Sequence, residues 1–333
     1  MKLKEIGEFG FIDRFASKFK PLIKPGDIGI GDDCAIISVN PHENQVVTTD
    51  LLVEDIHFLK QKIEPEHLGH KALAVNLSDI AAMGATPQAS FLSIAMPQDT
   101  DIAWLDSFMQ GYHSLSQQYQ VPLMGGDTTK SQQHLAINVV VTGLLDKTKA
   151  RLRCMAQTGD IVCVTGTIGD SAAGLQVLLD NLAQTALTKR LVAAHHLPQP
   201  QIKQGQWLAE QSSVHAMMDI SDGIASDLQH ILDASKKSAK VELNQLPISN
   251  DLVAAARTYG WNRYRLAAGG GEDYQLLITV RSDAMKQLNT GFIEVFNSPL
   301  YPIGTIHPGP GKITWQKKGH KIKNLIEGFN HFK

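Results

Sequence analysis

The sequence predicts an α/β or α+β protein built from two domains. Its 333 residues exceed what a single core usually organises, so two domains are the expected arrangement. Strand-like apolar runs alternate irregularly with longer segments of helical period, which argues against a regular parallel Rossmann sheet. Residues 147–153 form a short basic segment between two such series. We therefore expect an N-terminal domain at residues 1–150 and a C-terminal domain at residues 151–333.

The composition narrows the class of function. Lys and Arg total 31 against 33 Asp and Glu, a net charge of -2, and no extended basic segment predicts a nucleic-acid surface. The three cysteines, Cys34, Cys154 and Cys163, have no CxxC spacing, so neither a zinc site nor a disulfide framework is indicated. The N-terminus lacks a signal-peptide pattern, and the longest apolar run, residues 135–145, is too short to span a membrane. We expect a cytoplasmic protein with neither a nucleic-acid nor a membrane partner.

The first acidic motif follows a predicted helix at residues 6–20. It is the loop Gly29-Ile30-Gly31-Asp32-Asp33, and the strand after it, residues 45–50, ends in Asp50. Alternation along that strand places Thr48 and Asp50 on one face and Thr49 on the other. Carboxylates gathered in this way fit a Mg²⁺ site for a polyphosphate, although a surface turn and an ordinary strand would explain each segment alone.

A second signal lies in the helix predicted at residues 66–84. Asn76 and Asp79 interrupt its apolar body three residues apart, so they are neighbours on one face. A carboxylate in such surroundings is costly unless it is paired, hydrogen-bonded or bound to metal, which makes Asp79 a candidate ligand. Asn76 fits an exposed polar face equally well. His57, in the polar loop at residues 54–58, is either a solvated loop residue or a ligand contact.

The third motif, Gly125-Gly126-Asp127-Thr128-Thr129, is predicted to be a turn. A strand at 89–96, a helix at 104–119 with an aromatic core face and a strand at 121–124 precede it, and a buried strand at 135–145 follows. Glycine lets the backbone approach phosphate closely, and Asp127 can hold the accompanying metal. No Walker motif is present, because Thr129 and not glycine stands before Lys130.

Three further motifs mark the second half. A strand at 161–165 is expected to turn at residues 166–171 into a helix that runs to about residue 191 and is capped by Asp170 or Ser171. Asp219-Ile220-Ser221-Asp222-Gly223 is expected at a strand-to-helix turn. The segment 269–274, GGGEDY, leads into a strand at 275–280, and its three glycines beside two acids indicate a ligand site more than packing.

The recurring carboxylates point to one class of chemistry. They stand at positions 33, 50, 79, 127, 219 and 222. Several Mg²⁺ ions clamping phosphate oxygens would need this many, whereas a glycosidase needs only two, and no GxSxG motif occurs. Phosphoryl transfer is therefore the predicted reaction type.

Motifs along the whole chain resemble those of the thiamine-monophosphate kinase family. The matching segments are GEFGFI at 7–12, GIGDDCA at 29–35, TTD at 48–50, HF at 57–58, KALAVNLSDIAAMGA at 71–85, GGDTT at 125–129, VTGTIGDSAAGL at 164–175, DISDG at 219–223, GGGEDY at 269–274 and GFNHF at 328–332. Single motifs are shared with a wider superfamily that includes aminoimidazole ribonucleotide synthetase and selenophosphate synthetase. The ordered set is specific.

The resemblance implies an activity and an architecture. The family transfers the γ-phosphoryl group of ATP to thiamine monophosphate, which gives thiamine diphosphate in the last step of its biosynthesis and requires several Mg²⁺ ions. The implied fold is aminoimidazole ribonucleotide synthetase-like. It has an N-terminal mixed-sheet domain that binds ATP and Mg²⁺ and pairs in a homodimer, and a C-terminal α/β domain.

The resemblance also implies residue roles. The implied metal ligands are Asp33, Thr48, Thr49, Asp50, Asp79, Asp127, Asp219 and Asp222. The implied ATP contacts are Gly126, Asp127, Arg153 and Ser221, and the implied thiamine monophosphate contacts are His57, Glu272 and Phe329. Catalysis would rest on Asp50, Asp127 and Arg153. Arg151 is an alternative to Arg153, and Phe332 is an alternative to Phe329.

Two other functions are compatible with parts of the pattern. Selenophosphate synthetase would need a reactive cysteine, and Cys34 stands where a buried strand residue is expected. A non-catalytic Mg-nucleotide-binding protein would be favoured by loss of ligand carboxylates, and all of them are present. Because an acceptor phosphate is already largely ionised near neutral pH, we expect direct in-line transfer without a phosphoenzyme or a strong base.

Overall fold

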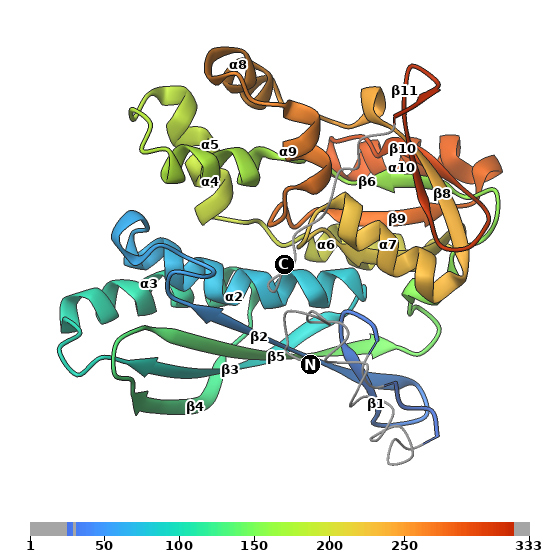
Figure 1. Cartoon of the computed structure of the whole chain (residues 1–333). Helices are drawn as coiled ribbons and strands as arrows, with labels where there is room; N and C mark the ends of the chain where they lie inside the picture. The colour runs from blue at the N-terminus through green and yellow to red at the C-terminus, as the bar shows by residue number, and fades with distance from the viewer. Residues whose placement is uncertain (1–24, 29–30, 323–333) are drawn as a thin grey trace, which may run out of the picture.

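The computed structural model describes residues 25–28 and 31–322. The first half of the chain contains a five-stranded sheet. Figure 1 shows this sheet as the lowest layer, with α2 and α3 above it and the second half of the chain above these helices. The helix predicted at 6–20 lies outside the described residues, as do Gly29-Ile30 and the segments 7–12 and 328–332. No helix in the described ranges combines the length and apolarity that crossing a membrane requires.

The first sheet has the strand order β1-β2-β5-β3-β4. Its strands are β1 (Ala35–Ser38), β2 (Glu43–Val53), β3 (Thr86–Met96), β4 (Leu123–Lys130) and β5 (Ala136–Asp146). All neighbours are antiparallel except β3 and β4, which are parallel. One face is buried beneath the helices, and the other exposes apolar side chains that include Ile37, Leu51 and Phe91. The alternation predicted for residues 45–50 is confirmed, because Thr48 is buried and Thr49 is exposed. The predicted end of the strand at Asp50 is wrong, because β2 stays paired with β5 as far as Val53.

Helix α2 (Pro65–Ala82) is the central element of the molecule. It begins with proline at its first position and is buried over most of its length. On one side it packs against β2 and β5, and on the other it contacts α6 and β7 of the second half. A polar side chain on this helix therefore lies inside protein on nearly every side. The helix predicted at 66–84 is confirmed.

Helix α3 (Ile102–Tyr119) crosses α2 at very short range, and it confirms the helix predicted at 104–119. A Cβ atom at Gly69 would lie 1.9 Å from Phe108 O, and one at Gly111 would lie 1.8 Å from Glu66 O. Only glycine permits this approach of the two backbones. Phe108 and Tyr112 are buried in the core beneath the crossing, as the aromatic pattern predicts.

The second half is built on a seven-stranded sheet of order β12-β11-β8-β10-β6-β9-β7. Its strands are β6 (Ile161–Val164), β7 (Val214–Asp219), β8 (Lys237–Glu242), β9 (Leu276–Val280), β10 (Tyr301–Pro308), β11 (Ile313–Lys317) and β12 (His320–Lys321). The pair β8–β11 is parallel, and the other pairs are antiparallel. Two mixed sheets thus confirm the predicted fold class. The boundary between residues 150 and 151, which falls between the sheets, stays a prediction.

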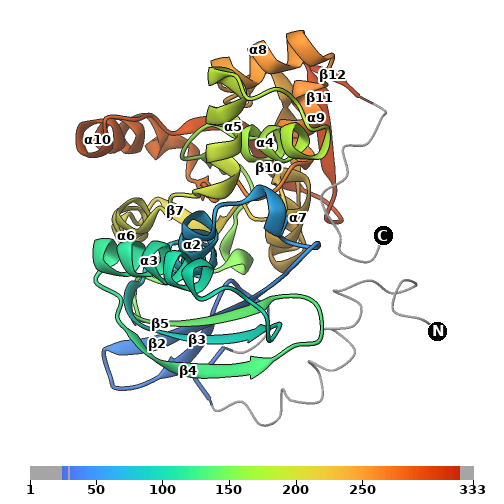
Figure 2. The same cartoon turned by 90° about the vertical axis from the view of Figure 1, so that its left-hand side faces the viewer.

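Seven α-helices of the described chain belong to this half. They are α4 (Asp170–Leu179), α5 (Ala186–His196), α6 (Ile202–Glu210), α7 (Ile224–Ser235), α8 (Asn250–Tyr259), α9 (Arg263–Gly269) and α10 (Met285–Phe296). The described chain also contains short 3-10 turns. One lies in the first half, η2 (Lys60–Lys62), and the others lie in the second half: η3 (Arg153–Met155), η4 (Leu243–Gln245) and η5 (Ser282–Ala284). Figure 2 shows α4, α5, α8 and α9 grouped together, away from the first sheet, while α6 lies beside α2.

Two predictions for residues 166–191 are wrong. The single long helix is two helices, because α4 ends at Leu179 and Asn181 adopts a left-handed φ of 51° before α5 begins. The cap is also different. Gly169 occupies the N-cap position of α4 without a side-chain hydrogen bond, and Asp170 is already helical. The hydroxyl of Ser171 instead lies 3.0 Å from His195 Nδ1.

Candidate active site

Carboxylates from five segments meet between the two halves of the chain. Asp33 precedes β1, Asp50 lies on β2, Asp79 lies on α2, Asp219 ends β7 and Asp222 lies in the turn before α7. These segments converge because α2 packs against β2 on one side and against β7 on the other. We call these five residues the acidic cluster.

Asp33, Asp79 and Asp219 form the centre of the acidic cluster. One carboxylate oxygen from each lies within 4.8 Å of the other two. Ser78 Oγ donates to Asp219 Oδ2 at 2.6 Å, and Thr48 Oγ1 donates to Asp79 Oδ2. Hard oxygen ligands at such spacing suit a divalent cation such as Mg²⁺.

The protonation equilibria of the acidic cluster show that negative charge is in excess there. Burial raises the pKa of Asp219 to about 8, and the charge of Asp33 adds to the rise. Burial also raises the pKa of Asp50 to about 6, with Asp222 adding its charge. The pKa of Asp79 lies well above its usual range, because of burial and then because of Asp50 and Asp219. Buried like charges of this kind mark a place where bound cations are stabilised.

Arg153 supplies positive charge from the chain itself. Its Nη2 lies 2.7 Å from Asp33 Oδ1, and its main-chain N–H donates to Asp32 Oδ2 at 3.1 Å. Burial raises the pKa of Asp32 to about 7, Asp33 adds to the rise, and Arg153 opposes it. One guanidinium therefore offsets only part of the local charge. Arg151 lies elsewhere, since its Nη2 donates to Ala209 O in α6 at 2.7 Å.

The glycine-rich segment 269–274 packs against the turn at 219–223. A Cβ at Gly271 would lie 2.3 Å from Ser221 O, and one at Gly223 would lie 2.5 Å from Gly270 O. The Glu272 main-chain N–H donates to Ser221 O at 2.7 Å across this contact. The glycines are thus required for close packing of two turns, contrary to the sequence interpretation, and this packing places Glu272 beside the acidic cluster.

Glu272 is held by two side chains from different halves of the chain. Lys71 Nζ, on α2, lies 2.9 Å from Glu272 Oε1, and His195 Nδ1, on α5, lies 3.0 Å from Oε2. Burial acts to raise the pKa of Glu272, but the charge of Lys71, together with the contact and hydrogen bond from His195, brings it well below the usual range. Glu272 is therefore a carboxylate at neutral pH. Its backbone is in the left-handed region, with a φ of 63°.

His57 lies in the loop that follows β2. The main-chain N–H of Val53 donates to His57 Nδ1 at 3.0 Å, so that nitrogen is unprotonated and Nε2 carries the hydrogen of the neutral ring.

Thr49 faces the side of the sheet away from α2, where Asn138 Nδ2 donates to its Oγ1 at 2.8 Å. The side chains of the adjacent residues Thr48 and Thr49 thus lie on opposite faces of β2.

Asp127 lies apart from the acidic cluster within one chain. The predicted turn is wrong, because residues 123–130 form the exposed strand β4, which pairs in parallel with β3. Register places Asp127 beside Ser93, on the face away from α2, whereas Asp50 faces α2. The order β2-β5-β3-β4 separates the two positions by three strand spacings, about 14 Å.

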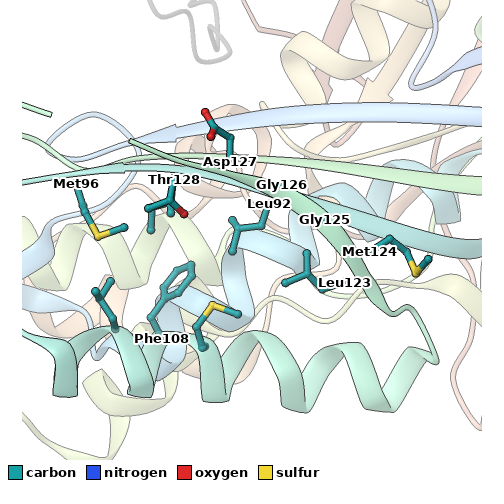
Figure 3. Close-up of a pocket in the computed structure, with 12 residues that line it drawn as sticks. Leu92, Met96, Phe108, Leu123, Met124, Gly125, Gly126, Asp127 and Thr128 are labelled. Atoms are coloured by element: carbon teal, nitrogen blue, oxygen red, sulfur yellow. The ribbon is translucent and has the colours of Figure 1, made fainter. Parts of the chain in front are cut away.

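A groove of about 560 Å³ lies between β4, β3 and α3. Figure 3 shows the side chains of Leu92 and Thr128 on the side of the strands that faces Phe108 of α3, while the carboxylate of Asp127 points away from α3. A Cβ at Gly126 would lie 1.7 Å from Leu92 O, so glycine is required here by the strand pairing. The groove is lined mainly by apolar side chains, and it is separate from the acidic cluster.

Comparisons with known proteins give the family. Residues 31–145 match the model of the AIR synthase related protein N-terminal domain, and residues 157–315 match that of the C-terminal domain. The thiamine-monophosphate kinase of Haemophilus influenzae is 38% identical over 338 residues, which cover 98% of each chain. That of Escherichia coli strain K12 is 37% identical over 335 residues, again 98% of each chain. The chain belongs to the thiamine-monophosphate kinase family.

A solved structure is similar over the same length. AaThiL complexed with AMPPCP and TMP is 32% identical, covers 99% of this chain and of its own, and has a TM-score of 0.84. Membership of the thiamine-monophosphate kinase family and its two-domain fold are thus established by sequence and by structure.

In this thiamine-monophosphate kinase family member, the acidic motifs identified from sequence converge, with one exception. Asp33, Asp50, Asp79, Asp219 and Asp222 come together, as do Thr48 and Arg153, while Asp127 does not. Ser221 lies within the turn that carries Asp219 and Asp222. Phe329 and Phe332 lie outside the described residues. The individual ligand roles stay predictions.

Sequence reasoning missed four polar residues of the site: Ser78, Lys71, His195 and Asp227. Asp227 is buried and accepts from the main-chain N–H of Asp222 at 3.2 Å. Lys71 had the same signal as Asp79, a charge within an apolar helix, and Ser78 directly precedes Asp79. His195 had no such signal, because its role depends on how α5 packs.

Proposed function

We infer that this chain transfers the γ-phosphoryl group of ATP to the phosphate of thiamine monophosphate and forms thiamine diphosphate and ADP. The observation that carries the inference is the acidic cluster, where buried carboxylates with raised pKa values meet between two halves of the chain. Family membership supports it, and so does AaThiL, which was solved with AMPPCP, an ATP analogue, and TMP. The relatives' name identifies TMP as thiamine monophosphate.

The donor set fits Mg²⁺ as the cofactor. It consists of carboxylate and hydroxyl oxygens, without a thiolate or imidazole at its centre. Bound Mg²⁺ would neutralise the phosphate oxygens as charge moves between them. We propose Asp33, Asp79 and Asp219 as the central ligands, with Asp50 and Asp222 at the edges and Thr48 orienting Asp79.

Arg153 supplies a positive charge that belongs to the protein itself. Two anions must approach each other in this reaction, and Arg153 provides a fixed positive charge at the same place. We propose that it contacts ATP and that Ser221 does so from the adjacent turn. No side chain needs to accept a proton, because the acceptor phosphate attacks as an anion. Its oxygen bonds to the γ-phosphorus as the bond to the bridging oxygen of ADP breaks.

We propose that His57 and Glu272 bind the thiamine moiety. Glu272 remains a carboxylate, and thiamine carries an aminopyrimidine donor and a thiazolium charge that a carboxylate can recognise. His57 would donate through Nε2, because Nδ1 is engaged with the backbone. Phe329, with Phe332 as the alternative, is the proposed aromatic contact.

We propose that the protein acts as a homodimer through the uncovered face of the first sheet. That face exposes Leu51 and Phe91, and an apolar sheet surface of this kind favours association. Thr49 and Asp127 also lie on it. A second copy packed on this face can bring the partner's Asp127, and Gly126 with it, to the Thr49–Asp50 edge of β2.

Selenophosphate synthesis is less well supported. Cys34 is buried, and burial together with Asp79 and Asp33 raises the pKa of its thiol well above the usual value. Such a group is a poor nucleophile. The three cysteines, all described and free, suit the reducing cytoplasm that we propose as the location.

The first prediction is the reaction itself. The pure protein, incubated with ATP, Mg²⁺ and thiamine monophosphate, is expected to form ADP and thiamine diphosphate in equal amounts, followed by chromatography. EDTA should abolish turnover, and free thiamine should not replace the monophosphate, because the acceptor must carry a phosphate for the metal ions to bind. Nucleotide binding without turnover would instead identify a non-catalytic binding protein.

A further inference from the structure

Glu272 takes its cationic partner from the other half of the chain. Lys71 projects from α2, and its side chain is 0% exposed, while that of Glu272 is 26% exposed. Within residues 25–28 and 31–322, Glu272 is the only carboxylate within 4.0 Å of this ammonium. The pair is therefore an isolated ion pair, with one partner enclosed and the other reaching the site.

Stability alone does not account for a lysine at this position. Its neighbours along α2, Ala72, Leu73, Ala74 and Val75, are buried and apolar. Enclosing an ammonium costs several kcal/mol of desolvation, and replacing a buried ion pair by apolar residues is often neutral or stabilising. A methionine would fit such surroundings without that cost. The lysine is thus explained by what it does to Glu272.

The surroundings of Glu272 define that effect. His195 from α5 contacts the second carboxylate oxygen, and His196 lies next to His195, with ring centroids 5.5 Å apart. Both imidazoles are buried, and the pKa of each is lowered, first by desolvation. At neutral pH they carry no charge, so Lys71 is the cation that fixes the carboxylate while His195 orients it through a hydrogen bond.

We propose that Lys71 is a positioning residue that holds the Glu272 carboxylate, across the junction of the two halves, in the place where it receives the aminopyrimidine of thiamine monophosphate. This proposal rests on the proposed function and assigns Lys71 no contact with ATP or with metal. One oxygen of Glu272 is fixed by α2 and the other by α5, and the carboxylate keeps an exposed side for the acceptor. Thiamine monophosphate binding then requires the two halves to be correctly placed.

The test compares Lys71→Met with Lys62→Met. Lys62 also connects the halves, since its Nζ donates to Leu178 O at 2.6 Å and to Asn181 Oδ1 at 2.9 Å, but it does not contact Glu272. Lys71→Met is expected to raise the KM for thiamine monophosphate about tenfold or more, as loss of a charge-assisted contact would, and to leave the KM for ATP within about twofold. Lys62→Met should leave both constants unchanged. Calorimetric titration with thiamine monophosphate should show the same loss of affinity.

A second pair of variants separates positioning from folding. In a Glu272→Gln background, adding Lys71→Met should change the KM for thiamine monophosphate by less than about twofold, because Lys71 then has no carboxylate to position. The double variant also removes the unpaired buried charge, so it provides the comparison if Lys71→Met alone does not fold.

Equal losses from Lys71→Met in both backgrounds, or an equal rise in both KM values, would overturn the proposal. Failure of the wild-type protein to phosphorylate thiamine monophosphate is a separate result, and it would overturn the proposed function instead.

Discussion

Asp50 differs from the other carboxylates of the acidic cluster in its position. It lies near the end of β2 facing α2, and the charge of Asp222 is its main electrostatic neighbour. Asp33 already has Arg153, and Asp219 already accepts from Ser78. Asp50 has no arginine partner or hydroxyl donor of this kind within the described part of the chain, so we expect its charge to be available to a bound cation.

Asp50→Asn should therefore lower turnover without lowering stability. Losing one transition-state electrostatic contact typically costs on the order of 100-fold to 1,000-fold in turnover. In the metal-free protein the folded-state pKa of about 6 lies above the unfolded value of 3.8. Stability from this group is present below pH 3.8 and is lost as the pH rises through 6, so the ionised form opposes folding at pH 8. Metal-free melting of the variant at pH 8 should be unchanged or slightly higher.

The control for this prediction is Asp106→Asn, an exposed carboxylate on α3. It should alter neither turnover nor melting. The melting advantage of Asp50→Asn should shrink as the pH is lowered toward about 5, where wild-type Asp50 also becomes neutral in the fold. Near-normal turnover, or inactivity that coincides with unfolding, would move Asp50 from the catalytic residues to the structural ones.

Single residues were predictable where a local rule was broken. Asp79 stands in an apolar helix, and the free-energy cost of burying its carboxylate there made it a candidate ligand. The same rule applies to Lys71 in the same helix. Lys71 was not identified as a site residue, because lysine is not a metal ligand. Arg153 was predicted with Arg151 as the alternative, because only the path of η3 shows that the Arg153 guanidinium reaches Asp33.

At the scale of elements, the crossing of α2 and α3 sets the position of the acidic residues on α2. The helices touch through Gly69 and Gly111, so their backbones leave no room for a methyl group. A shift of α2 away from α3 would displace Asp79 and Lys71 together, because they share that helix. Packing on one side of α2 is thereby linked to site geometry on the other.

Gly111→Ala is expected to test this link. The new Cβ would lie 1.8 Å from Glu66 O, a backbone atom that cannot move alone, and overpacking of this kind costs about 1–3 kcal/mol. Melting temperature should fall, and turnover of the folded fraction should fall with it. Gln110→Ala, at the exposed neighbouring position, should change stability by less than about 0.5 kcal/mol. A Gly111→Ala protein with normal melting would show that the helices separate freely.

Some secondary-structure elements were predictable from the sequence, and others were not. The α2 and α3 helices were recognisable from period and length. The break between α4 and α5 was missed because both sides continue an apolar period, and Asn181 is a weak signal for a left-handed turn. Residues 125–129 of β4 were predicted to be a turn because glycines and polar residues dominate them. They continue the strand because β3 supplies the hydrogen bonds. Glycines 270 and 271 were assigned to ligand binding, although their close contacts lie with residues distant in sequence.

At the scale of the whole molecule, one chain does not assemble every predicted ligand. Asp50 and Asp127 stand on opposite faces of the first sheet and three strands apart. A single Mg²⁺ ion holds its ligands at about 2.1 Å, so these two carboxylates of one chain cannot share an ion. If both take part, as the family motifs predict, Asp127 must act on the site of a second copy.

Mixing two inactive variants tests this arrangement. Asp50→Asn and Asp127→Asn, each purified alone, should have turnover reduced on the order of 100-fold or more. After subunit exchange, a mixed dimer carries both substitutions at one site and neither at the other, because each site takes Asp50 from one chain and Asp127 from its partner. With random exchange in an equal mixture, half of the dimers are mixed, so turnover per chain should recover to about one quarter of the wild-type value. Native mass spectrometry of differently tagged chains would establish that mixed dimers have formed. Mixed dimers without recovered turnover would place both carboxylates in one chain's site, and near-normal turnover of Asp127→Asn alone would remove Asp127 from catalysis. Recovery near one quarter requires two copies around each site.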